Sequence, residues 1–393
     1  MKILHVVPSY LPAWRYGGPI RSVDGLARAQ VGLGHAVTVF TTDADGPGRL
    51  AVETEREVAL DGVAVRYFPR RFPARLFRAP ELARELARRV GEFDVVHAHS
   101  VFLEPTRLAA RAAERAGVPF FLSPRGMLVA ELIRQRGALR KRLWIRLVER
   151  RTLARASGIV VQSELERREL EQLGLPTAPI HVVPNGVDFG DDGRATPAER
   201  AAEVARIVAG GPYLLSLGRV SWKKGIDRLI AALPQLPGAR LVVAGNDDEG
   251  LTPALARQAA DLGVADRVHF VGEVGGEAKA ALLGAAAVFC LPSRSENFGQ
   301  AALEAMAAGR PVVLTPEVGL ASFPEARAAV VLSPGEPAAL AAATGALLAD
   351  PAAAARLGAA ARAVAESHFA WPAIAARMTA LYAAPADSGT GPS

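Results

Sequence analysis

The chain has 393 residues, half of them hydrophobic, which is enough for two α/β domains of ordinary size that each bury a core. Its single cysteine, Cys290, excludes a disulfide framework and a cysteine-based metal site, and the apolar run around it predicts a small buried core residue. No stretch reaches the roughly 18 apolar residues of a membrane span, and the opening MKILHVVPSYLP lacks the features of a signal peptide, so the cytoplasm is the expected location.

The net charge of +6 is unevenly distributed along the chain. Residues 1–188 contain 29 Lys and Arg against 20 Asp and Glu, whereas the remainder contains 17 against 20. The first half therefore carries the whole positive excess.

Short apolar runs rich in β-branched residues alternate with helical stretches from end to end. Runs of this kind are typical of strands buried on both faces of a parallel sheet, and the alternation indicates repeated βαβ units. In chain order the predicted strands are 2–7, 35–42, 63–68, 94–99, 119–123, 158–163, 180–184, 212–218, 239–245, 267–272, 287–292, 311–315 and 328–333.

Two such sets of strands predict two doubly wound Rossmann-like domains, with the boundary in a Pro-, Gly- and Asp-rich stretch. We expect an N-terminal domain over 1–188 and a C-terminal domain over 189–370. For the last helix, 371–385, we consider a return to the first domain, and the tail 386–393 is expected to be disordered. Ligands of such sheets bind beyond the carboxyl ends of the strands, so a central cleft between the domains is the expected active site.

The loop RYGGP follows the first predicted strand and precedes a helix. Gly17 and Gly18 would let the backbone approach a ligand closely, and the helix start behind them favours an anion. The spacing is not GxGxxG, so a dinucleotide site is not supported, and a plain turn is an equally good interpretation.

The predicted strand DVVHAH carries two histidines, His97 and His99. Because side chains alternate along a strand, we expect the two rings to face opposite sides of the sheet and not to bind one metal ion together. His99, at the carboxyl end, is the candidate for pointing into the cleft; a structural histidine is the alternative.

A strongly basic segment spans residues 132–156 and contains one acid, Glu149. An apolar stripe of Leu143, Trp144, Leu147 and Val148 runs along it at helical spacing. This pattern suits an amphipathic helix on an anionic membrane surface, whereas the alternative is a stripe that faces the core below a solvated basic face. Nucleic acid is the weaker interpretation, since no binding module accompanies the charge. Its nine cations are Arg134, Arg136, Arg140, Lys141, Arg142, Arg146, Arg150, Arg151 and Arg155.

In the second half, the loop LGRVSWKKG follows a predicted strand and precedes a helix. Arg219 and Lys224 bracket the loop, and two cations beside a helix start form a plausible cradle for a diphosphate. Lys223 competes with Lys224 for this role, and one of the two is expected to be merely solvated.

The segment SENFGQAALEAMAAG places Glu296 directly after an apolar run and starts a helix at Asn297, Phe298 and Gly299. Glu304 then lies among apolar helix residues, where burial is costly unless a hydroxyl-bearing ligand or another partner hydrogen-bonds it. Free amides at the helix start would donate hydrogen bonds to a phosphate or sugar oxygen. The alternative is a loop charge at Glu296 and a solvated helix residue at Glu304.

Taken in order, the GG loop, DVVHAH, PNGVD, GRxxxxKG and the two glutamates separated by seven residues resemble the retaining GT-B glycosyltransferases of family 4. The resemblance covers nearly the whole chain. SPRGML, residues 123–128, together with SENFG is similar to a bacterial subset that builds exopolysaccharide or lipopolysaccharide.

The resemblance implies a nucleotide-sugar donor held mainly by the second domain. Arg219 and Lys224 would bind its diphosphate and stabilise the departing nucleotide. Glu304 would hold the ribose hydroxyls, and Glu296 would contact the sugar with help from the backbone at 297–299.

The first domain would bind the acceptor, a saccharide or lipid-linked molecule. Gly17 and Gly18 would approach the donor phosphate, and His99 would contact the sugar near the reacting carbon. Arg125, in SPRGML, is a candidate for the acceptor.

The implied reaction retains the anomeric configuration, with the donor phosphate accepting the acceptor's proton. No cofactor and no metal are expected, because the cations supply the electrostatic stabilisation. The loop TPEVGLASFPEA departs from the family pattern, with Gly319-Leu320 in place of a double glycine. A nucleotide-sugar epimerase, a non-catalytic nucleotide-sugar-binding protein and a glycosidase using the two glutamates are the alternatives.

Overall fold

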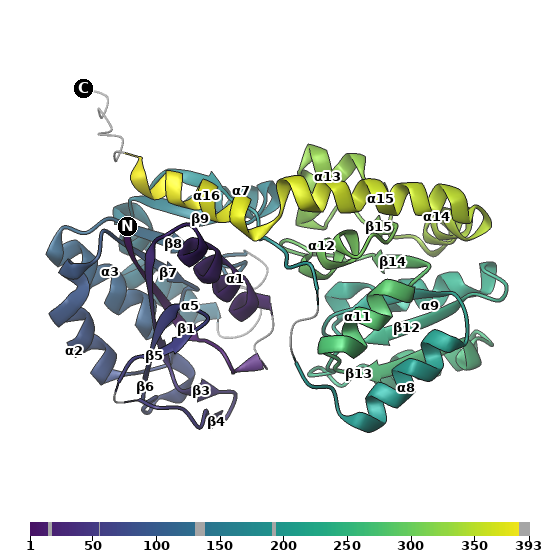
Figure 1. The fold of residues 1–393 in the computed structure, drawn as a ribbon, viewed down its shortest axis with the longest axis horizontal. Coiled ribbons are helices and arrows are strands. Elements are labelled where there is room, and N and C mark those ends of the chain that lie inside the picture. The colour runs from purple at the N-terminus through teal and green to yellow at the C-terminus, as the bar shows by residue number, and fades with distance from the viewer. Residues whose placement is uncertain (15–17, 55, 130–137, 191–193, 385–393) are drawn as a thin grey trace. The chain divides into compact units, whose positions relative to one another are not determined.

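The computed structural model describes residues 1–14, 18–54, 56–129, 138–190 and 194–384 (Figure 1). The chain divides into two compact units. The N-terminal unit comprises Met1–Gly186 together with the chain from Trp371 onward, and the C-terminal unit comprises Val187–Ala370.

The N-terminal unit is built on a sheet in the order β10-β9-β8-β7-β1-β2-β6-β5, parallel except for the pair β5–β6. Its strands are β1 (Lys2–Ser9), β2 (Ala36–Thr42), β5 (Val58–Leu60), β6 (Val63–Phe68), β7 (Val95–His99), β8 (Phe120–Ser123), β9 (Gly158–Val161) and β10 (Ile180–Val182), and a separate pair is formed by β3 (Ala44–Asp45) and β4 (Gly48–Arg49).

Helices cover both faces of this sheet. One apolar core joins it to α2, α3, α6 and α7, and the other joins it to α1 and α16. The helices are α1 (Gly18–Gly32), α2 (Pro80–Arg89), α3 (Glu104–Ala116), α5 (Ala138–Trp144), α6 (Arg150–Arg155), α7 (Glu164–Glu171) and α16 (Trp371–Ala383), and a π-helix, η4 (Ile145–Glu149), links α5 to α6.

The C-terminal unit has a wholly parallel sheet in the order β13-β12-β11-β14-β15-β16. Helices α8, α11, α12, α13 and α15 share one core with it, and α9, α10 and α14 share the other. The strands are β11 (Tyr213–Leu217), β12 (Arg240–Ala244), β13 (Val268–Gly272), β14 (Val288–Leu291), β15 (Val312–Leu314) and β16 (Val331–Leu332). The helices are α8 (Ala198–Ala209), α9 (Ile226–Ala232), α10 (Thr252–Asp261), α11 (Gly276–Ala285), α12 (Gln300–Ala307), α13 (Pro324–Ala328), α14 (Pro337–Ala349) and α15 (Pro351–His368).

The apolar runs of the sequence all become strands, and Cys290 is fully buried in β14, as predicted. Strands β3, β4 and β5 were not predicted: β3 and β4 have two residues each and almost no apolar character, and β5 is a run of only three apolar residues. Within the described residues no single helix is long and apolar enough to cross a membrane; α14 and α15 satisfy length and composition only as a pair, bent by 102°.

The last helix, α16, closes the N-terminal unit through Trp371. Its indole lies so close to two glycines that a Cβ at Gly25 would sit 2.2 Å, and one at Gly186 2.4 Å, from the ring. Only glycine permits this approach, and the two contacts attach the end of the chain to α1 and to the segment after β10.

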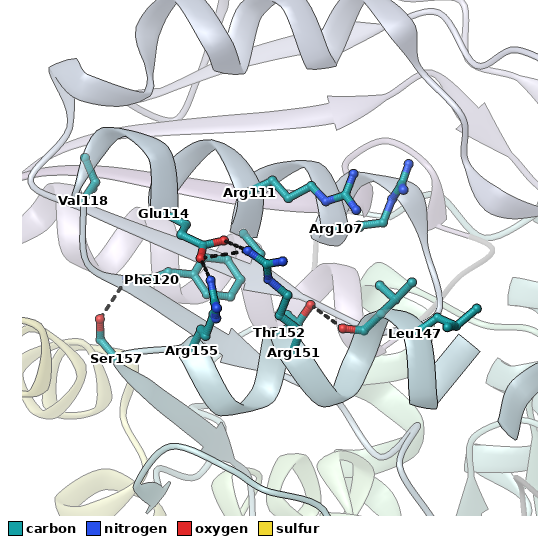
Figure 2. Close-up of a pocket in the computed structure, with 12 residues that line it drawn as sticks. Arg107, Arg111, Glu114, Val118, Phe120, Leu147, Arg151, Thr152, Arg155 and Ser157 are labelled. Carbon is teal, nitrogen blue, oxygen red and sulfur yellow. Dashed lines mark hydrogen bonds and ion pairs between the residues drawn. The ribbon is translucent and has the colours of Figure 1, made fainter. Parts of the chain in front are cut away.

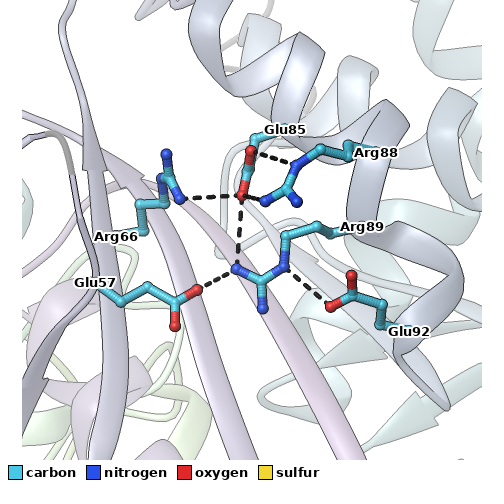
Figure 3. Close-up of polar contacts among 6 residues, drawn as sticks. All are labelled: Glu57, Arg66, Glu85, Arg88, Arg89 and Glu92. Atoms are coloured by element: carbon cyan, nitrogen blue, oxygen red, sulfur yellow. Dashed lines mark hydrogen bonds and ion pairs between the residues drawn. The ribbon is translucent and has the colours of Figure 1, made fainter.

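An ion-pair network fastens α2 to the sheet (Figure 3). Glu85 receives hydrogen bonds from Arg66 on β6 at 3.1 Å and from Arg88 at 2.7 Å, and Arg89 lies 3.6 Å away. The hydrogen bond from Arg88 holds the pKa of Glu85 below its usual value. We therefore assign these charged side chains a structural role, which is to join α2 to the sheet.

Candidate active site

In each sheet the strand order reverses between two central neighbours. In the C-terminal unit these neighbours are β11 and β14, and in the N-terminal unit they are β1 and β7. The loops that leave the carboxyl ends of such a pair diverge to opposite faces and leave a crevice where ligands bind. The residues predicted to bind the donor lie on the loops after β11 and β14, and Gly18 and His99 follow or end β1 and β7.

The structure brings Lys224 and Glu296 together at the crevice of the C-terminal unit. The ammonium Nζ lies 2.5 Å from the carboxylate Oε2, and each side chain is 20% exposed. Lys224 lies over the end of β11, because a Cβ at Gly218 would be 3.5 Å from its Nζ. A cation and an anion, both reachable from solvent, therefore meet where the two strands diverge.

The backbone of Glu296 is fixed by the loop after β15. Its N–H donates to Glu317 at 3.0 Å, and its carbonyl accepts from Gly319 at 2.9 Å. The loop that departs from the family pattern thus holds Glu296 in place through main-chain bonds, which do not depend on a double glycine.

Gly225 makes the close approach of the β11 and β14 loops possible. Its φ is +68°, and a Cβ there would lie 2.1 Å from the carbonyl oxygen of Pro292. Arg294 then donates its N–H to the carbonyl of Lys223 at 2.7 Å and pairs with Asp227. The two loops are therefore held together by their backbones before any ligand binds.

Gly225→Ala is expected to destabilise the C-terminal unit by at least about 2 kcal/mol, since it adds left-handed strain and a backbone clash. Gly284→Ala in α11 is the matched control, because a Cβ there meets nothing within 4 Å. Thermal unfolding of both variants checks the prediction, which an unchanged midpoint for Gly225→Ala would contradict.

The other cation predicted for the diphosphate, Arg219, lies at the start of the same loop. Its side chain is exposed and makes no hydrogen bond or ion pair with any residue that the structure describes. Lys223 instead lies 5.7 Å from the ring of Trp222, so Lys224 is the lysine of the pair that joins the site.

The residues 297–299, predicted to contact the donor, lie just before α12, which begins at Gln300 and not at Asn297 as predicted. Gly299 caps the helix at φ +100°, and a Cβ there would lie 2.7 Å from the side chain of Val318. Phe298 is buried and stacks edge-on against Phe323. The amides of Phe298 and Gly299 donate to no partner within the described part of the chain, which leaves them available to an anion.

Glu304 has a partner that the sequence did not reveal. Lys279 of α11 places its Nζ 2.9 Å from Oε2 of Glu304, with side chains 10% and 17% exposed. The pair solves the burial problem of a glutamate in an apolar helix without a ligand. Donor hydroxyls would therefore have to share or replace this contact.

The loop after β1 is described only in part. Gly17 lies outside the described residues, and Gly18 is the first residue of α1. A Cβ at Gly18 would meet nothing within 4 Å, so local packing alone does not require glycine there.

Two of three neighbouring buried histidines, His99 and His5, form a hydrogen-bonded chain with Arg125 and Gln30 in the N-terminal unit. Arg125 Nη2 lies 3.1 Å from His99 Nδ1, His99 Nε2 lies 3.0 Å from His5 Nδ1, and His5 Nε2 lies 2.8 Å from the Gln30 carbonyl oxygen. A guanidinium can only donate, so His99 accepts at Nδ1 and donates from Nε2 to His5, which in turn donates to Gln30. His97, the third histidine, bonds Ser123 and Tyr382.

The prediction that His97 and His99 face opposite sides of the sheet is wrong. Their rings are 4.1 Å apart, on the face covered by α1 and α16. Residues two apart in a strand share a face because the side-chain period is two. His99 is also only 2% exposed, with both ring nitrogens engaged, so its contact with a sugar stays a prediction.

Ligand atoms of His5, His97 and His99 lie within 4.8 Å of one another, which is near the spacing of a metal site. A metal-bound histidine normally donates its other N–H to an acceptor. His99 would then direct an N–H at Arg125, which has no acceptor. The arrangement of these ring nitrogens therefore fits the hydrogen-bonded chain better than it fits a metal ion.

Burial keeps these histidines neutral. It lowers the pKa of His5 from 6.5 to about 4 and holds the pKa of His97 and of His99 well below the usual value. It also lowers the pKa of Arg125 to about 10, so the guanidinium stays charged at neutral pH.

Arg125 links three segments of the N-terminal unit. Besides His99, it donates to Ser22 of α1 at 3.2 Å and to Asn185 after β10 at 3.0 Å. Its backbone is left-handed, with φ +57°. Asn185, part of PNGVD, was not predicted as its partner. The side chain is occupied by protein groups here, so its role toward an acceptor stays a prediction.

Two family models match the chain. The model described as "Glycosyl transferases group 1" matches residues 198–364, and the one described as "Glycosyl transferase 4-like domain" matches residues 17–186. The two matches correspond to the two units.

Individual proteins also match the chain, in sequence or in structure. A D-inositol 3-phosphate glycosyltransferase of Xylanimonas cellulosilytica is 35% identical over 321 residues, which cover 78% of this chain and 76% of the relative. Sucrose-phosphate synthase of Thermosynechococcus elongatus superposes with a TM-score of 0.71 at 25% identity, over 97% of this chain and 98% of that one. HepE of Anabaena, solved with UDP-glucose, gives 0.71 at 22% identity, over 97% and 98%.

Proposed function

Because the chain belongs to the group 1 glycosyltransferases, which have the GT-B fold, we propose that it is a retaining, metal-independent hexosyltransferase. It would move a sugar from a nucleotide-sugar donor to a saccharide or lipid-linked acceptor of envelope or polysaccharide synthesis. The cytoplasm, where nucleotide sugars would be available, is the proposed location.

The observation that carries the proposal is the pair of Lys224 and Glu296 at the crevice between β11 and β14. A diphosphate entering the crevice offers Lys224 an anion with more negative charge than one carboxylate. Glu296, once released, accepts hydrogen bonds from sugar hydroxyls. The ion pair thus holds both side chains in place until the donor binds, when the diphosphate replaces Glu296 as the partner of Lys224 and the sugar hydroxyls replace Lys224 as the partner of Glu296.

Neighbouring groups fit the rest of a donor. The exposed guanidinium of Arg219 would add a second cation to the diphosphate, and the amides of Phe298 and Gly299 would donate to its oxygens or to the sugar. Glu304, reachable through its 17% exposure, would accept from ribose hydroxyls while Lys279 keeps its charge balanced.

In the proposed reaction the bond between the anomeric carbon and the donor phosphate breaks as the acceptor oxygen bonds to the same face of that carbon. The departing phosphate oxygen takes the acceptor's proton. Negative charge grows on the diphosphate as it leaves, and Lys224 and Arg219 stabilise it there. On the N-terminal unit, Gly18 and His99 are proposed for the donor and Arg125 for the acceptor.

The proposal predicts a ligand-induced rise in melting temperature with one class of nucleoside diphosphate, since binding to the folded state alone stabilises it by mass action. UDP-glucose is the first donor to test because it was found in HepE. D-inositol 3-phosphate belongs among the first acceptors because a relative is named for it.

Product analysis by NMR then separates the outcomes. A glycoside with the donor's anomeric configuration supports the proposal. Conversion of the donor without an acceptor would indicate an epimerase, and binding without any turnover would indicate a non-catalytic protein.

A further inference from the structure

Three leucines project from the basic segment, residues 132–156. Leu139, Leu143 and Leu147, on α5 and η4, are 82%, 58% and 67% exposed. Trp144 and Val148 are half-buried. The predicted stripe is therefore split: one part packs on the unit, and the leucines face solvent at four-residue spacing.

The one acid of the segment points the other way. Glu149 is 2% exposed and accepts hydrogen bonds from the backbone N–H of Phe102 and the indole of Trp144, both at 2.7 Å. Burial raises the pKa of Glu149, and these bonds oppose the rise. The carboxylate is thus withdrawn from the surface that the leucines occupy.

Cations surround the leucines on the same short stretch. Arg142, Arg146 and Arg150 are exposed and Lys141 is half-buried. We call these four, with the three leucines, the α5–α6 surface. Residues 130–137 and the side chain of Arg140 lie outside the described part and take no part in the inference.

An arginine pocket opens beside this surface, between α3 and α6 (Figure 2). Arg107 and Arg111 come from α3, and Arg151 and Arg155 come from α6. Within the pocket Glu114 bonds Arg155 and, at 3.2 Å, Arg151, and at its edge Glu104 lies 3.8 Å from Arg107, which leaves two positive charges in excess.

The position and size of the pocket suit a small anionic group. Leu147 lines both the pocket and the α5–α6 surface. The volume of the pocket, about 100 Å³, is far below the roughly 300–1,000 Å³ of ordinary ligand pockets, so the pocket is too small for a nucleotide sugar. The remaining positive charge fits a single phosphate.

We propose that the α5–α6 surface docks on a membrane rich in anionic lipids, with a lipid phosphate in the arginine pocket. The leucines would enter the interface between headgroups and acyl chains, and the surrounding cations would meet the negative surface. Nucleic acid would satisfy the charge but leave three exposed leucines without a role. Membrane docking does not require catalysis, so this inference stands independently of the proposed function.

Flotation with vesicles tests the proposal. The full chain is expected to float with vesicles that contain phosphatidylglycerol in phosphatidylcholine, less so at high salt, and not with phosphatidylcholine alone. Arg107→Gln/Arg111→Gln should lower partitioning about thirtyfold, at about 1 kcal/mol for each cation near the surface. Leu143→Ser/Leu147→Ser should lower it as well, because exposed leucines contribute little to folding.

Arg206→Gln/Arg257→Gln is the matched control, because it removes the same charge from exposed helix positions of the C-terminal unit. It should float like the unchanged protein. Absence of flotation by the unchanged protein, equal flotation with both kinds of vesicle, or full flotation of the Arg107/Arg111 variant overturns the proposal. Stabilisation by inorganic phosphate without flotation would indicate a small-anion site and also overturn it.

Discussion

Replacing Lys224 by methionine is expected to lower kcat/KM for sugar transfer by about 10²–10³-fold, the usual effect of removing one group that stabilises developing charge. Methionine keeps the length of the side chain but cannot stabilise the departing diphosphate. The partner Glu296 is 20% exposed and can be hydrated, so folding should change little, by less than about 1 kcal/mol. Transfer kinetics and thermal unfolding measured together check both parts.

Lys223→Met is the control, since Lys223 lies over Trp222 and not at Glu296. It should retain most of the activity. Normal transfer by Lys224→Met would remove Lys224 from the donor site. Glu296→Gln and the double variant with Lys224→Met provide a second test. If each side chain contacts the donor separately, the losses in kcat/KM of the two single variants multiply in the double variant. If the pair is purely structural, the double variant loses no more kcat/KM than either single variant.

The strands could be predicted from the sequence because parallel strands buried on both faces leave continuous apolar runs. Once the order of the strands in the sheet is known, the loops that form the crevice can be identified from the sequence, because Lys224 comes after β11 and Glu296 comes after β14. Strand order itself is not encoded locally, and neither is the close approach at Gly225, which depends on the carbonyl of Pro292.

The partners of the predicted residues could not be found in the same way. Lys279 precedes Glu304 by 25 positions on another helix, and no local pattern connects them. His5 lay in an apolar strand and was not singled out, yet it receives the hydrogen bond of His99. Long-range pairs of this kind arise from packing, so a sequence names the candidate residues but not what holds each of them.

The exposed leucines show the same limit. Helical spacing identified Leu143 and Leu147 together with Trp144 and Val148 as one stripe. A π-helix at η4 changes the number of residues per turn, so a single helical period does not divide the stripe correctly. Trp144 and the buried Glu149, which are joined by a hydrogen bond, mark the side that packs on the unit.

The N-terminal unit is expected to lose stability as the pH falls from about 6.5 toward 4. Burial lowers the pKa of His5 from 6.5 to about 4, so in this range the unfolded chain binds a proton that the folded chain does not. The free energy of unfolding then decreases by roughly 3 kcal/mol from His5 alone, and His97 and His99 act in the same direction. Above about pH 6.5 neither state binds these protons, so stability is independent of them.

Urea unfolding followed by hydrogen exchange of β1 and β7 between about pH 7 and pH 5 measures this effect, because carboxylates such as Glu85 titrate at lower pH. His5→Gln should reduce the pH dependence, since glutamine carries no titratable proton, while His97 and His99 still contribute. His368→Gln, an exposed position of the C-terminal unit, should leave it unchanged. A midpoint that does not change with pH in the unchanged protein would contradict the prediction, because it would mean that folding does not lower the pKa of these histidines.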